Sequence, residues 1–145
     1  MDGFQAWCAL GLKLVQWRHQ ILIADILRMS GQTPNALEYI LEAERQDKVK
    51  HSGLGIADFH IMKGNLLIAE GHLAEGEATL TQALSRRQSA RLFELRAATS
   101  LARLWGDRGE RAKAWDLLAP IYQGFTEGLE TLNLRQAKAL LEDLS

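Results

Sequence analysis

Apolar residues recur along most of this chain at the i, i+3, i+4 and i+7 spacing of helices that bury one face. No segment shows a convincing strand pattern of alternating apolar and polar residues. The pattern therefore predicts an all-α fold. We expect helices at about 33–48, 54–70, 73–87, 91–107, 111–124 and 134–144, after one long helix or two short ones over about 4–29.

Three glycines, Gly31, Gly71 and Gly109, separate neighbouring helical runs at intervals of 40 and 38 residues. Glycine ends helices well because it adopts the left-handed conformation without a Cβ penalty. Repeats of this length are typical of stacked helical hairpins. We therefore expect one domain over 1–145, made of three hairpins at about 4–48, 54–87 and 91–124 and a C-terminal capping helix at about 134–144.

The residues around each glycine repeat as well. Small residues lie seven positions before and five after it, and bulky residues lie four before and nine after. Two helices approach closely only where side chains are short, so the small residues would lie where the helices of a hairpin cross. The small positions are Ala24, Ala36, Gly64, Gly76, Ala102 and Ala114, and the bulky ones are Leu27, Ile40, Leu67, Leu80, Trp105 and Leu118.

The helix ends carry two further signals. Thr33 and Asn133 are predicted N-caps, because their side-chain oxygens can accept a bond from the first turn. Gln136, three residues after Asn133, would complete a capping box. The last helix is amphipathic, with Ala137 and Leu141 on its apolar face, as the end of a repeat array requires.

This small and bulky spacing around a turn glycine resembles the tetratricopeptide repeat. In the second repeat, Gly64 takes the place of the glycine of the first helix, Gly71 that of the turn glycine, and Ala83 that of the second alanine. The usual tryptophan and terminal proline are missing, and the intervals exceed the family's 34 residues. The resemblance implies a divergent α-solenoid with lengthened helices, which would present a binding surface.

A narrower resemblance covers about 55–144. The run 93–105 (FELRAATSLARLW), together with 117–122 (LLAPIY) and 125–128 (FTEG), is similar to a segment of large bacterial signalling proteins. There the segment ends a tetratricopeptide array behind an adenylate cyclase or DNA-binding domain and a P-loop ATPase module. The resemblance implies a non-catalytic regulatory role through a protein or peptide partner. We expect this chain to be a detached tail of such a protein or a truncated reading frame.

Composition narrows the classes of partner and compartment. Basic and acidic side chains number 17 and 18, so no charge excess would draw the chain to nucleic acid or to an anionic membrane. No apolar run approaches the roughly 20 residues of a membrane-spanning helix. Cys8 is the single cysteine, which excludes an intramolecular disulfide and fits a reducing cytoplasm. We expect a cytoplasmic protein.

The sequence offers little for catalysis. It contains no Gly-x-x-x-x-Gly-Lys-Ser/Thr loop and no His-Glu-x-x-His pair. His51 and His60 with Asp58 could be imagined as a metal site, but solvated or locally hydrogen-bonded side chains explain them better. We expect no enzymatic activity, no cofactor and no metal. Two alternatives stay open: a small-ligand-sensing helical domain, and a protein related to cyclases in name only.

In tetratricopeptide arrays the first helix of each hairpin lines a concave groove, and the resemblance transfers this to nine positions here. Arginines there would suit a carboxylate or phosphate of the partner, although an ordinary solvated helix face is the simpler interpretation. Ile61 and Thr99 replace lysines that would grip an acidic chaperone tail, which argues against a chaperone co-factor. The expected exposed groove residues are Arg18, Asp25, Arg28, Asp58, Ile61, Asn65, Arg96, Thr99 and Arg103.

The N-terminal run is a second candidate surface. Phe4, Trp7, Leu10 and Leu14 would expose apolar surface that a preceding repeat normally covers. Bare apolar patches drive association. We therefore expect self-association through the N-terminal helix.

Overall fold

The computed structural model describes residues 19–46, 56–85 and 91–145, and within these ranges the chain forms helices and turns but no strand. This confirms the all-α prediction. The helices are the helical residues 19–29, α2 (Thr33–Gln46), α3 (Ile56–Ala69), α4 (Leu73–Ser85), α5 (Arg91–Asp107), α6 (Arg111–Gln123) and α7 (Leu132–Leu144). The predicted bounds of α5 are correct, and the predicted ends at 4, 48, 54 and 87 lie outside the described residues.

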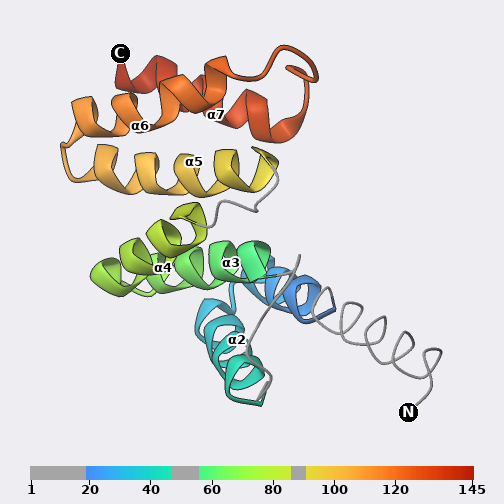
Figure 1. The fold of residues 1–145 in the computed structure, drawn as a ribbon. Coiled ribbons are helices and arrows are strands. Elements are labelled where there is room, and N and C mark those ends of the chain that lie inside the picture. The colour runs from blue at the N-terminus through green and yellow to red at the C-terminus, as the bar shows by residue number, and fades with distance from the viewer. Residues whose placement is uncertain (1–18, 47–55, 86–90) are drawn as a thin grey trace.

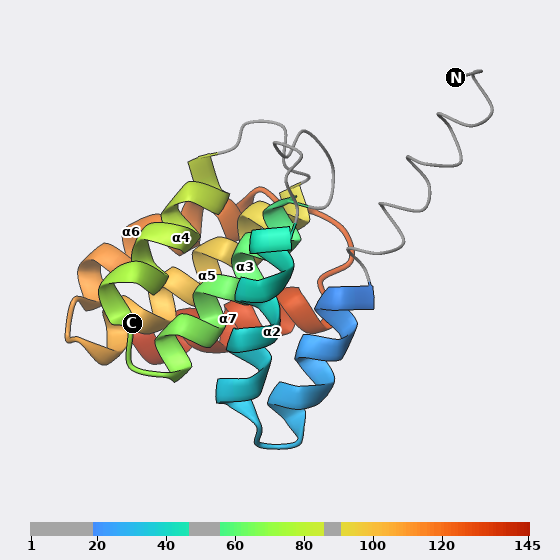
Figure 2. The ribbon, with the colours of Figure 1, turned by 90° about the horizontal axis from the view of Figure 1, so that it is seen from below.

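Successive helices pack side by side in antiparallel pairs (Figure 1). The most extensive contacts join α3 to α4 and α5 to α6, which are the two helices of a pair. The helix α5 also contacts α3 before it and α7 after it. Seen from below, α4 and α6 lie on the same side of α3 and α5 (Figure 2). The first helices of the pairs therefore share one face of the protein.

The three glycine turns have the same geometry. Gly31, Gly71 and Gly109 adopt φ values of 80°, 87° and 84°. Each glycine N–H donates to the carbonyl three residues before it, at 3.0–3.1 Å, and the next N–H donates five residues back at 2.8 Å. This pair of bonds ends a helix on a left-handed residue. The residue after each glycine accepts the first hydrogen bond of the next helix, so one turn both ends and starts a helix.

The small residues lie at the helix crossings as predicted. Ala24, Ala36, Ala102 and Ala114 are fully buried. At the crossing of α3 and α4, a Cβ built on Gly76 would lie 2.6 Å from Ile68 Cγ1 and 3.0 Å from the Gly64 carbonyl oxygen. No room for a side chain is left at this crossing.

Bulky residues fill the space between the crossings. The predicted positions Ile40, Leu80 and Leu118 are fully buried, each in a different one of three apolar clusters that follow one another along the chain. Trp105 and Leu84 contact two of these clusters. The core is therefore continuous between the clusters of the last two helical pairs.

Two predicted helix caps are wrong. The α7 helix begins at Leu132, two residues earlier than expected, and Thr131 takes the cap position in an extended conformation without a side-chain bond. Asn133 therefore lies inside α7 and forms no capping box. The Ala36 N–H donates to the Gln32 carbonyl, which makes Gln32 the residue before α2 and Thr33 its first helical residue. In both cases the chain enters the helix from a short loop whose backbone already accepts the first hydrogen bond.

The crossing of α3 and α4 makes a testable prediction. Gly76→Ala gains about 1 kcal/mol of helix propensity, but its methyl group would meet backbone atoms that cannot move aside. We expect a net loss of about 1–2 kcal/mol in the free energy of unfolding, measured by urea denaturation. The matched control is Gly106→Ala in α5, whose Cβ would meet only the flexible Leu144 side-chain end at 3.0 Å. Equal effects of the two substitutions would contradict the crossing.

Candidate functional site

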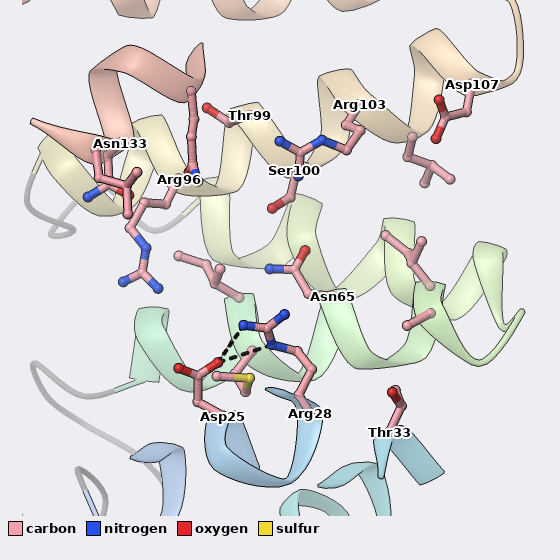
Figure 3. Close-up of a pocket in the computed structure, with 17 residues that line it drawn as sticks. Asp25, Arg28, Thr33, Asn65, Arg96, Thr99, Ser100, Arg103, Asp107 and Asn133 are labelled. Atoms are coloured by element: carbon pink, nitrogen blue, oxygen red, sulfur yellow. Dashed lines mark hydrogen bonds and ion pairs between the residues drawn. The ribbon is translucent and has the colours of Figure 1, made fainter. Parts of the chain in front are cut away.

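A groove with a volume of about 690 Å³ runs along the face that the first helices share. Its walls come from the helical residues 19–29, α3, α5 and α7, with Thr33 at the start of α2 (Figure 3). Three helical pairs and the last helix therefore contribute to one site. The lining residues are Asp25, Arg28, Thr33, Ile61, Met62, Asn65, Ile68, Ala69, Arg96, Thr99, Ser100, Arg103, Leu104, Asp107, Leu132, Asn133 and Gln136.

The structure brings most of the predicted site residues together. Asp25, Arg28, Ile61, Asn65, Arg96, Thr99 and Arg103 all line the groove. Asp58 is not a lining residue but binds one of them, since its carboxylate accepts a hydrogen bond from Arg96 at 2.6 Å. Arg18 lies outside the described residues. The first-helix positions therefore share one site.

Two of these residues were wrongly expected to be exposed. Ile61 is 2% exposed and Thr99 is 8% exposed, so both are buried beneath the groove. Ile61 packs in the apolar cluster that joins α3, α4 and α5. The Thr99 hydroxyl donates to the Leu95 carbonyl at 2.7 Å and is therefore not available to a partner through its proton.

The sequence analysis missed several lining residues. Ser100 adjoins a predicted position, and Asp107 lies one helical turn beyond Arg103. Extending the predicted face by one turn would have found Asp107. Asn133 and Gln136 come from α7, which had been considered only as a cap. If α7 is treated as the first helix of a further pair, the same pattern predicts that α7 lines the groove.

Two of the arginines that line the groove already form ion pairs. The Arg28 guanidinium donates twice to one Asp25 carboxylate oxygen, at 2.7 and 3.0 Å (Figure 3). The pair of Arg96 with Asp58 joins α5 to α3. Arg103 and Asp107, by contrast, form no hydrogen bond or ion pair with any residue that the structure describes. One cation and one anion of the groove are thus left without a partner within these residues.

A further network lies outside the groove lining and holds the last two helical pairs together. The indole N–H of Trp105 donates to Glu77 at 2.8 Å, and Arg108 donates to the other carboxylate oxygen at 2.6 Å. These two bonds, that of Trp105 first, hold the pKa of Glu77 below its usual value of 4.5. Lys113 lies 4.0 Å over the Trp105 ring and so ties α6 to the same point.

The described residues contain no cluster of three or more histidine, cysteine, aspartate or glutamate side chains that could hold a metal ion. Among the helices of residues 19–46, 56–85 and 91–145, none has the length and apolar character that crossing a membrane needs. No protein-family model, curated protein or solved structure matches this chain.

The lowered pKa of Glu77 predicts a pH-dependent stability. Because the folded-state pKa lies below the unfolded value, the ionised form stabilises the fold above pH about 4.5, and this contribution is lost as the pH falls through the folded pKa. Glu77→Gln should lower the free energy of unfolding by about 1–2 kcal/mol at pH 7. The difference from the wild type should shrink towards pH 3, as followed by urea denaturation at each pH.

The control is Glu127→Gln, in the exposed segment before α7. It should leave the stability at pH 7 within about 0.5 kcal/mol of the wild type. A Glu77→Gln effect that stays constant from pH 7 to pH 3 would show that the ionised carboxylate is not its cause.

Proposed function

We propose that this chain is a non-catalytic interaction module, a tetratricopeptide-like α-solenoid that binds a protein or peptide partner in the groove. The main support is that the first helices of successive pairs converge on one groove lined by the residues that the repeat pattern selects. The three matching glycine turns and the α3–α5 and α5–α7 contacts support the solenoid arrangement.

The groove suits a peptide better than an apolar molecule. Most of its wall side chains are polar or charged, and the amide of Asn65 and the hydroxyl of Ser100 face the same space as Arg103 (Figure 3). A peptide main chain offers both donors and acceptors to such groups. The resemblance to bacterial signalling proteins adds the proposal of a cytoplasmic regulatory role, in which the partner couples this module to another domain or protein.

A small ligand is the second candidate, because the groove volume of about 690 Å³ lies within the range of small-molecule sites. A thermal-shift screen against nucleotides and acyl compounds tests it. Stabilisation by one compound class that disappears in Asn65→Leu would favour this candidate over a peptide partner.

The peptide proposal predicts that ligands selected by the protein occupy the groove. Dodecapeptides selected from a displayed random library against the full chain should lose about tenfold or more in affinity for Asn65→Leu, since Leu keeps the branched shape of Asn but removes its amide. The matched control is Gln82→Leu, an exposed position of α4 outside the lining. Peptides that bind both variants equally, or a selection with no binders, would contradict the proposal.

Self-association through the N-terminal region is also proposed. Its expected residues, from Phe4 to Leu14, lie outside the described part of the chain. The helical residues 19–29 nonetheless expose Leu22, Ile26 and Met29 at fractions of 55%, 56% and 75%, along one helix face. Such a stripe is typical of a helix that packs against another element.

Light scattering tests this association over a range of concentrations. We expect the mass per particle to exceed that of the 16.2 kDa chain at high concentration, and Ile26→Glu to restore the monomer mass. The control is Leu132→Glu, which changes a residue that is 66% exposed at the start of α7. A wild-type protein that is monomeric at every concentration would refute the association.

A further inference from the structure

We propose that the groove recognises a pair of opposite charges on an extended peptide, with an acidic side chain on Arg103 and a basic side chain two positions away on Asp107. The inference rests on the proposed function, because it names the partner chemistry of the same groove. It concerns the two charged lining residues that the described part of the chain leaves unpaired.

The other groove charges are already neutralised. Arg28 is bound to Asp25 at 2.7 Å, and Arg96 is bound to Asp58 at 2.6 Å. A partner charge at either place would have to displace an existing ion pair. Arg103 and Asp107 are the charges that a partner can meet without that loss.

Arg103 and Asp107 do not pair with each other, although they lie four residues apart on α5. Figure 3 shows the Arg103 guanidinium turned towards Ser100 and away from Asp107. An acid that follows a base along a helix is the less favourable order for such a pair. Each charge therefore stays open towards the groove.

The position of Asp107 is costly in the free protein. It lies at the end of α5, where the helix dipole is negative, and the last turn of α5 contains no basic residue. The neighbouring Arg108 donates to Glu77 instead. A cation from a partner would offset the repulsion between the Asp107 carboxylate and the helix dipole. An acidic residue that is unfavourable in the free protein would then be favourable in the complex.

The spacing of the two backbone positions suits an extended segment. Four residues of α5 rise by about 6 Å along the helix axis. Side chains on the same side of an extended peptide are about 6.6 Å apart at positions i and i+2. A helical partner would match the distance with positions i and i+4, but its main-chain groups are already bonded. The Asn65 amide and Ser100 hydroxyl between the two walls favour a partner with free main-chain donors and acceptors.

The test uses the full chain and labelled octapeptides of glycine and serine that carry one Glu and one Lys. The two charges are placed at i and i+2 in both chain orders, next to each other, and at i and i+4. We expect one order of the i, i+2 peptide to bind best, with amide NMR shifts at α3 and α5. Its affinity should fall about two- to fivefold in Asp107→Asn.

A charge exchange gives the decisive result. In the double variant Arg103→Asp with Asp107→Arg, the preferred chain order of the i, i+2 peptide should reverse, because the two charged positions have changed places. Equal binding of both orders by the wild type, or an unchanged preference in the double variant, would overturn the proposal.

Stability provides a second readout. Asp107→Asn should raise the melting temperature by about 1–4 °C while it weakens binding. Asp143→Asn is the control for binding, since Asp143 also lies in the last turn of a helix but outside the groove, where Arg111 donates to its carbonyl oxygen. It should leave peptide affinity unchanged. If Asp107→Asn instead lowers the melting temperature or leaves binding unchanged, the proposal fails.

The outcomes separate this inference from the proposed function. If library-selected peptides bind the groove but carry no such charge pair and bind Asp107→Asn normally, the interaction module stands and the charge-pair inference is wrong. If no peptide of either kind shifts the groove residues, both are wrong.

Discussion

The structure depends on one backbone conformation that occurs three times. A glycine with φ near 80–87° ends a helix, and the next residue starts the following helix within the same turn. Since the turns are alike, each returns the chain antiparallel to the helix that it ends (Figure 1). The intervals of 40 and 38 residues then bring every first helix to the same face. The groove is a consequence of this repetition and not of any single residue.

The elements predicted well are those fixed by local geometry. Backbone sterics and helical periodicity determine the glycine turns, the small residues at the crossings and the bounds of α5. Both depend only on residues that are close in the sequence. The resemblance to tetratricopeptide repeats also selected seven of the residues that line the groove. It did not distinguish exposed from buried lining residues, because the burial of Ile61 in the cluster of α3, α4 and α5 depends on how the helical pairs stack.

The helix caps and the role of α7 were harder to predict from the sequence, because they too depend on contacts outside the local segment. Asn133 has a side chain that suits a cap, but its position was decided by the loop that enters α7, where Thr131 is already extended. That shift places Asn133 and Gln136 in the groove wall. The charges behave in the same way: Glu77 and Arg108 look like surface residues in the sequence, yet the bonds of Trp105 and Arg108 to Glu77 join two helical pairs. These interactions between helical pairs join residues about 30 positions apart in the sequence, so a local sequence pattern does not reveal them.

The first and the last helix of the described residues differ in the side chains that they expose. The outward side of α7 carries exposed charges such as Arg135, Lys138 and Glu142, whereas the helical residues 19–29 expose an apolar stripe. A further helix packed against this stripe would bury apolar surface, whereas one packed against the outward side of α7 would bury charges. An engineered extension of the groove is therefore better placed against the helical residues 19–29 than against α7.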